Sequence, residues 1–231
     1  MKRPSFVTLY FDVVDTEGHN HGPNSAELDA ALAATDAAVG KLVEGLKARG
    51  LFEHANLIVT ADHGMADVSP DRIVYLDDVV RADALRIVTT GTNAGLSIAP
   101  GAPEDTLAKL LALRDHARCY RKADLPKELH YGRNPRVPPV VCLADVGWFI
   151  TTHDRMKAQK GPFEKGAHGY RPDAPEMAAG FIAEGPAFSK GVKLEPFDNV
   201  DIEPLMVELL GLKGPKADGT AGVFRPVLSG H

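Results

Sequence analysis

The sequence predicts an α/β fold in which a mostly parallel sheet is flanked by helices. Three consecutive segments carry this prediction: a strand-like run at residues 5–11, a helical stripe that begins after Asn24, and an apolar run at residues 57–61. Strand, helix and strand in this order form a βαβ unit, whose two strands lie parallel because the connecting helix crosses one face of the sheet.

Each element has its own signal. Residues 5–11 (SFVTLYF) are β-branched and aromatic, which favours a strand. Asn24 is a suitable N-cap for the helix, Glu27 follows three residues later, and Gly50 is expected to end it. Residues 57–61 (LIVTA) are expected to form a fully buried parallel strand. The helical stripe recurs at spacings of four and three through Leu28, Leu32, Thr35, Val39, Leu42 and Leu46.

The rest of the chain is less regular. We expect strands at residues 86–90, 94–99 and 137–143 and a helix at 104–116, so that residues 86–152 form a small α+β lobe inserted into the core. Residues 152–175 are expected to form a long loop, and long loops in compact domains are usually functional. A strand at 177–183 and a helix at 201–210 follow.

Composition excludes several classes of protein. The 231 residues are 44% hydrophobic, and 26 Lys and Arg against 31 Asp and Glu leave a net charge of -5, so we expect no nucleic-acid partner. No apolar run is long enough to span a membrane, and the N-terminal run is too short for a signal peptide, so we expect no export signal in this chain. Cys119 and Cys142 are expected to be free buried thiols, and a single disulfide is the alternative.

Acidic and imidazole side chains follow both strands of the predicted βαβ unit. The segment DTEGHNHGP begins at Asp15 and the segment DHGM begins at Asp62. Because parallel strands end at one sheet edge, we expect the two segments to lie within reach of each other. Carboxylate and imidazole groups are suitable zinc ligands, although a single Asp after a strand can instead form a turn or cap. Glycines 18, 22 and 64 leave the backbone free to approach a bound anion.

Three ordered motifs carry a family resemblance. FDVVDTEGHNHGP, then LIVTADHGM, then FEKGAHGYRPDAPEMAAGFIAEGPAF resemble the nucleotide pyrophosphatase/phosphodiesterase family of the alkaline phosphatase superfamily. The match runs from about Phe6 to the C-terminal segment, where FDNVDIEPLMVELLGL is similar to the last helix of the family. The resemblance implies an alkaline phosphatase-like core with two zinc ions about 4 Å apart.

The resemblance also implies site residues. Asp15, His19 and His168 would hold one zinc ion, and Asp62 and His63 would hold half of the other. His19 is preferred to His21 because the family pattern is Asp, three residues, then His. Tyr10 would stack on the nucleotide base, and a strand aromatic that faces the core is an equally weighted alternative.

Part of the family site has no counterpart in this sequence. The family takes the remaining ligands of the second ion, an Asp and a nucleophilic Thr, from a segment before the residues that match Phe6. No Thr of this chain stands in a comparable place. We therefore expect residues 1–231 to be the C-terminal part of such an enzyme and an incomplete domain. The chain would hold at most one zinc ion well, would be inactive alone, and would associate through an uncovered sheet edge.

The implied activity is zinc-dependent hydrolysis of phosphodiester and phosphoanhydride bonds in nucleotides or similar small esters, through a phospho-threonine intermediate. A phosphonate or phosphomonoester hydrolase of the same superfamily is one alternative, because the metal ligands do not select the substrate. A catalytically inactive metal-binding fragment is another. The resemblance implies a periplasmic or extracellular location for the parent enzyme.

Overall fold

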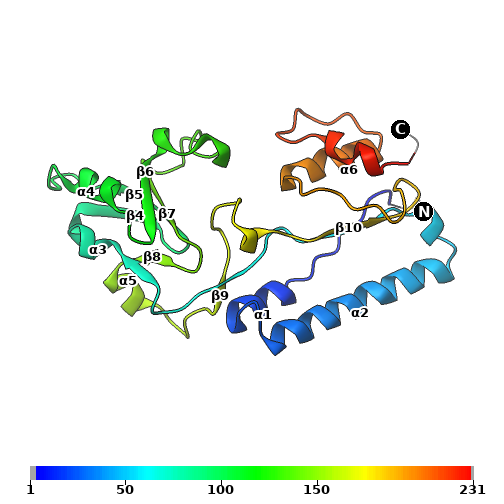
Figure 1. The fold of residues 1–231 in the computed structure, drawn as a ribbon, viewed down its shortest axis with the longest axis horizontal. Coiled ribbons are helices and arrows are strands. Elements are labelled where there is room, and N and C mark those ends of the chain that lie inside the picture. The colour runs from blue at the N-terminus through cyan, green and yellow to red at the C-terminus, as the bar shows by residue number, and fades with distance from the viewer. Residues whose placement is uncertain (1–3, 230–231) are drawn as a thin grey trace. The chain divides into compact units, whose positions relative to one another are not determined.

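The computed structural model describes residues 4–229, which fold into two compact units (Figure 1). The sheet unit contains residues 12–32 and 63–178. The terminal unit contains the described residues of 4–11, 33–62 and 179–229. Helices and short sheets occur in both units, which agrees with the predicted α/β class.

The centre of the sheet unit is a four-stranded antiparallel sheet in the order β4-β5-β7-β6. It falls largely within the predicted lobe at residues 86–152, although the boundaries of that lobe stay a prediction. Leu96, Leu110 and Cys142 are fully buried in its core. The strands are β4 (Leu85–Thr89), β5 (Asn93–Ile98), β6 (Ala117–Arg121) and β7 (Val140–Ala144), with α4 (Thr106–Ala112) between β5 and β6.

Two short strand pairs complete the sheet unit. β3 (Ile73–Tyr75) runs parallel to β8 (Phe149–Thr151), and β2 (Ala66–Asp67) runs antiparallel to β9 (Gly166–Ala167). The expectation of a mostly parallel sheet is therefore wrong for the described residues, where β3–β8 is the one parallel pair between named strands. The sheet unit also contains the α-helices α1 (Val13–His21), α3 (Leu76–Val79) and α5 (His153–Ala158).

The predicted loop at residues 152–175 contains two regular elements, α5 and β9. The hydroxyl of Thr152 caps α5 by accepting a hydrogen bond from the backbone N–H of Arg155 (3.3 Å). The loop prediction failed here because α5 is too short for its sequence to show helical periodicity.

The terminal unit contains one strand pair, packed with Leu205 and Phe224 in its core. β1 (Leu57–Thr60) pairs antiparallel with β10 (Phe181–Glu184), and α6 (Ile202–Leu209) follows. The predicted buried parallel strand at 57–61 is therefore wrong in orientation, and Val59 is 39% exposed. The strand that pairs with β1 comes from the distant end of the chain, which local sequence does not reveal.

Residues 5–11 are not a strand in this structure. They carry no ladder pairing, and their apolar side chains, Tyr10 among them, are exposed. β-branched and aromatic residues favour an extended backbone, but a strand also requires a partner, and no strand among residues 4–229 pairs with this segment.

The longest described helix, α2 (Ala26–Ala48), has the predicted end and a different start. The hydroxyl of Ser25 accepts from the N–H of Leu28 (3.2 Å), so Ser25 and not Asn24 is the cap. At the other end the N–H of Leu51 donates to the carbonyl of Leu46 (2.9 Å), and Gly50 has φ +61°, as expected for a glycine C-cap. Within residues 4–229, none of the helices combines the length and the apolarity needed to cross a membrane.

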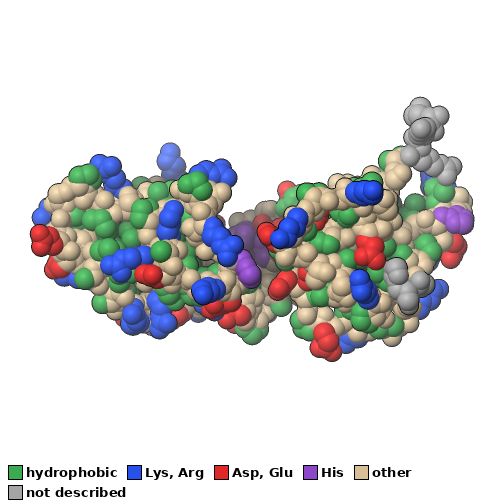
Figure 2. All heavy atoms as spheres, turned by 90° about the horizontal axis from the view of Figure 1, so that it is seen from above, with side chains coloured by type: hydrophobic (Ala, Val, Ile, Leu, Met, Phe, Trp, Pro, Cys, Tyr) green, Lys and Arg blue, Asp and Glu red, His purple; other side chains and the backbone are tan. Residues whose placement is uncertain are grey.

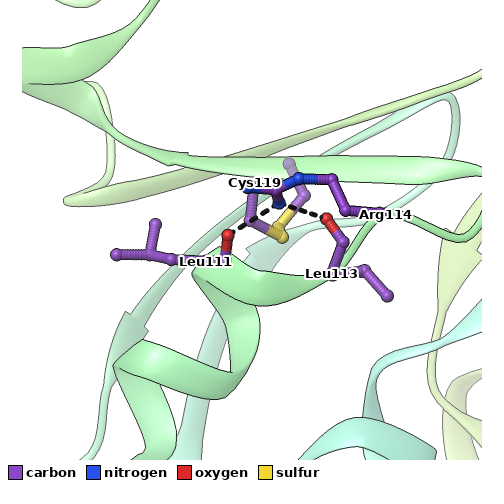
Figure 3. The surroundings of a disulfide bond; sticks show 5 residues. Leu111, Leu113, Arg114 and Cys119 are labelled. Atoms are coloured by element: carbon purple, nitrogen blue, oxygen red, sulfur yellow. Dashed lines mark hydrogen bonds between the residues drawn. A yellow bond between two sulfur atoms is a disulfide. The ribbon is translucent and has the colours of Figure 1, made fainter.

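A disulfide joins Cys119 to Cys142, so the expectation of two free thiols is wrong. The two cysteines face each other in the β6–β7 register and are buried. Figure 3 shows Arg114 next to the disulfide, where its guanidinium donates to the carbonyls of Leu111 (2.7 Å) and Leu113 (2.6 Å). The cross-link therefore joins the edge strand β6 to its neighbour β7 beside the end of α4.

Candidate metal centre

The helix α1 places Asp15 and His19 on one face. Residues 13–21 are helical, and the two residues of an i,i+4 pair lie one above the other on a helix. The Oδ1 atom of Asp15 is 3.5 Å from Nε2 of His19. The spacing of these two residues is thus explained by one helical turn.

The strand β9 brings the third residue to this face. Its Gly166 passes so close to α1 that a Cβ at that position would lie 2.3 Å from the carbonyl oxygen of Gly18. His168 follows β9 directly, and its Nε2 is 3.7 Å from Oδ1 of Asp15.

Burial raises the pKa of nearby Tyr170 to about 12, so its phenol stays neutral and donates to the carbonyl of Trp148 (3.2 Å).

A backbone carbonyl orients the imidazole of His19. Nδ1 of His19 lies 2.9 Å from the carbonyl oxygen of Gly166. Because a carbonyl can only accept, the geometry assigns the proton to Nδ1 and leaves the lone pair of a neutral ring on Nε2. A carbonyl behind the imidazole is a usual support for a metal-ligating histidine.

His63 approaches the same carboxylate from another segment of the sheet unit. Its Nε2 lies 3.9 Å from Oδ1 of Asp15, and its ring stacks on that of His168 with centroids 3.5 Å apart. Nδ1 of His63 is 3.0 Å from the carbonyl of Gly64, which assigns the proton to Nδ1 here too.

One carboxylate oxygen, Oδ1 of Asp15, lies between the imidazole nitrogens of the centre. Oδ1 of Asp15 is buried, and no donor of the described chain reaches it with hydrogen-bond geometry. A buried oxygen without a partner is costly, and three Nε2 atoms surround it at 3.5 to 3.9 Å. Two ligands of a tetrahedral ion, each about 2.1 Å from it, lie about 3.4 Å apart. The spacing fits a cation held by Asp15, His19 and His168, whose ligand atoms all lie within 4.8 Å of one another.

Asp62, Tyr10 and His21 are not members of the group formed by Asp15, His19 and His168. Asp62 belongs to the terminal unit, where its backbone carbonyl accepts a hydrogen bond from Asn199 (3.1 Å), and its role as a ligand stays a prediction. Tyr10 belongs to the same unit and is 80% exposed, which contradicts the core-facing alternative. His21 lies near Glu17 (3.3 Å) and Glu27 (3.7 Å).

Sequence reasoning missed residues that support the centre. Gly166 and Glu164 were not singled out, although Oε2 of Glu164 is 3.5 Å from Nδ1 of His19. Glycines 18, 22 and 64 were expected to admit an anion, but a Cβ at Gly64 would lie 2.1 Å from the carbonyl oxygen of Glu176. Their space is occupied by neighbouring residues of the chain. The signal available in the sequence was the short spacing of Glu164, Gly166 and His168.

Comparison with known proteins gives concordant matches. The family model "Type I phosphodiesterase / nucleotide pyrophosphatase" matches residues 1–171. Among curated proteins, the bis(5′-adenosyl)-triphosphatase ENPP4 of Bos taurus is 36% identical over 94% of this chain and 47% of its own length. The venom phosphodiesterase CdcPDE of Crotalus durissus collilineatus is 35% identical over 98% of this chain and 28% of its own.

Solved structures agree with the sequence matches. Human ectonucleotide pyrophosphatase/phosphodiesterase 5 superposes with a TM-score of 0.84 at 29% identity, over 93% of this chain and 56% of that chain. An inactive threonine-to-alanine variant of the murine protein in complex with AMP has the same TM-score at 31% identity. The chain spans about half the length of the ENPP4 relatives that it matches.

Proposed function

The chain belongs to the type I phosphodiesterase / nucleotide pyrophosphatase family, and from this premise we propose that it supplies the metal-binding part of a phosphodiester hydrolase. Its substrates are nucleotides or similar small esters with phosphodiester or phosphoanhydride bonds. The observation that carries the proposal is the buried Oδ1 of Asp15, surrounded by three imidazole nitrogens at 3.5 to 3.9 Å.

Zinc is the ion that this donor set suits, because two imidazoles and a carboxylate form a common catalytic zinc site with one position left open. When bound, zinc neutralises charge on the phosphoryl oxygens and activates water. The residues of the chain prepare the site for it. Asp15 would provide a negatively charged ligand, and His19 and His168 would provide the two imidazole ligands. The carbonyl of Gly166 holds the ring of His19 in place.

Asp62 and His63 are proposed as half of a second zinc site. We propose that the other half, including the threonine that would be phosphorylated, is not supplied by residues 1–231. We therefore propose that the chain alone holds one zinc ion well and does not turn over. The nucleophile would be absent, and in-line attack requires a positioned nucleophile.

An exported location is proposed for the parent enzyme. The disulfide between Cys119 and Cys142 supports it, because disulfides persist in oxidising compartments. The names of the relatives, which include venom and ectonucleotide enzymes, point the same way.

Calorimetric titration of the metal-free chain tests this proposal. We expect one zinc ion per chain and binding of AMP by the zinc-loaded form only. His168→Ala should remove both, whereas His21→Ala, in a histidine outside the cluster, should change neither. Two tightly held ions, or binding of AMP without metal, would contradict the proposal.

An assay with p-nitrophenyl thymidine monophosphate tests the inactive state of the isolated chain. We expect no turnover with zinc present. Turnover that disappears in Asp62→Ala would show that a residue of this chain serves as the nucleophile. A longer form that also contains the segment found in the relatives can be assayed with this diester and with p-nitrophenyl phosphate. Faster cleavage of the diester would indicate a diesterase, and faster cleavage of the monoester would indicate a monoesterase.

A further inference from the structure

Two adjoining cavities lie within the sheet unit. The first, of about 260 Å³, has His19 and His168 in its wall. The second, of about 460 Å³, shares Thr90, Phe149 and Glu164 with the first. Both cavities are open to solvent and adjoin at these residues, so a ligand held at the metal centre has the second cavity beside it.

One part of the lining of the second cavity is aromatic and aliphatic, and the rest is polar, with Thr90, Thr151 and Gln159 beside two charged residues. The rings of Phe149 and Phe163 meet edge to face with centroids 5.2 Å apart, and Ile73 and Met156 lie beside them. Small-ligand sites commonly combine apolar walls of this kind with polar groups that orient the ligand. Aromatic walls favour a flat aromatic ligand, and the flexible thioether of a methionine adapts to its shape.

The charges around the second cavity cancel. Its charged lining residues are Arg155 and Glu164. The Arg155 guanidinium donates to the carbonyl of Ile87 (3.0 Å), and the Glu164 carboxylate stands in the wall that both cavities share, 3.5 Å from Nδ1 of His19. No excess of cations is present in this lining to hold a polyphosphate, and a carboxylate in the shared wall repels an anionic leaving group.

We propose that the second cavity binds the leaving group of the substrate and selects an uncharged aromatic group joined through an ester bond. The inference rests on the proposed function, since it assigns a second part of the same substrate. It narrows the substrate class to phosphodiesters whose leaving group is the size of an aromatic ring system, in preference to phosphoanhydrides with a charged leaving group.

Two esters of one nucleotide test the inference. The 1-naphthyl and methyl esters of thymidine 5′-monophosphate carry the same charge and differ only in the leaving group. We expect the zinc-loaded chain to bind the naphthyl ester roughly tenfold or more tightly than the methyl ester, because the ring system leaves water to pack against the apolar part of the cavity wall. Calorimetry measures both affinities on the intact chain.

Two tryptophan substitutions on α5 locate the effect. Ala158 lines the second cavity, so Ala158→Trp should fill it and reduce the affinity ratio of the two esters to about one. Lys157, the neighbouring exposed residue, does not line it, so Lys157→Trp should keep the ratio. Unchanged zinc-dependent binding of the methyl ester shows that both variants are folded.

The outcomes separate this inference from the proposed function. Absence of zinc-dependent binding of the methyl ester would overturn the proposed function. Binding of the methyl ester with no preference for the naphthyl ester would overturn the leaving-group site alone. A preference that survives Ala158→Trp would also overturn it, since the aromatic group would then lie elsewhere.

Discussion

Three imidazole nitrogens lie around Oδ1 of Asp15, and the residues near this atom divide into proposed ligands and groups that support them. His19 and His168 are close enough to share an ion with it, while Gly166 has no side chain and acts through its carbonyl. A ligand and its support fail in different ways when they are substituted. Loss of a ligand removes a metal bond, whereas crowding of a support displaces a correct ligand.

His168→Ala should weaken zinc binding by more than about a hundredfold, because loss of an outer-shell partner alone typically costs 10- to 100-fold. Competition with a chromophoric chelator measures the affinity. His21→Ala is the matched control, since His21 lies on α1 with Asp15 and His19 but is outside the cluster. If His21→Ala weakens zinc binding more than His168→Ala does, the assignment of His168 as the ligand is wrong.

Gly166→Ala should both destabilise the chain and weaken zinc binding. The new Cβ would lie 2.3 Å from the carbonyl oxygen of Gly18, so backbone must move, at a cost of about 1 to 3 kcal/mol. The movement also displaces the carbonyl that holds His19. Thermal unfolding and zinc titration measure the two effects. As a control, Gly40→Ala places its new Cβ in open space on α2 and should not destabilise the chain. Equal unfolding temperatures and zinc affinities of the two variants would refute the close contact at Gly166.

At the scale of elements, the sheet unit depends on contacts between segments that are distant in sequence. β6 and β7 are joined by the disulfide, and β9 reaches back to both β2 and α1. The backbone N–H of Lys165, just before β9, donates to the carbonyl of His19 (2.8 Å), so the segment that leads to His168 is hydrogen-bonded to the helix that carries Asp15 and His19. Short elements of this kind are stable only through such partners.

Removal of the disulfide should lower the free energy of unfolding by about 3 kcal/mol, since the cross-link closes a loop with a sequence separation of 23. The double variant Cys119→Ala/Cys142→Ala is compared with the parent chain by urea unfolding. The parent under reducing conditions should shift in the same direction. A midpoint that is unchanged in both experiments would show that the sheet does not need the cross-link.

At the scale of the whole molecule, charged side chains of both signs are interspersed over the surface shown in Figure 2. The terminal unit departs from this pattern at its N-terminal segment, where Val7 and Leu9 are more than half exposed. Ile182 on β10 is 70% exposed as well. Apolar residues in an unpaired extended segment are a common site of association.

The chain should therefore associate in a concentration-dependent manner. The double variant Val7→Lys/Leu9→Lys should shift sedimentation velocity profiles toward the monomer, because charges on an extended segment oppose pairing. Val88→Lys is the control, an equally exposed apolar position on β4 of the sheet unit. A parent chain that is monomeric across the concentration range would contradict the expectation.

The sequence by itself determined the family and predicted the ligand residues, because both rest on motifs of a few residues. It also determined the body of α2 and its glycine stop, whose signals lie within a few helical turns. Tertiary structure alone decided that Asp15 and His19 lie on a helix, that β1 pairs antiparallel with β10, and that Cys119 faces Cys142. These features depend on which distant segments pair and in which register. Pairing free energy comes from both partners at once, so neither segment encodes it alone.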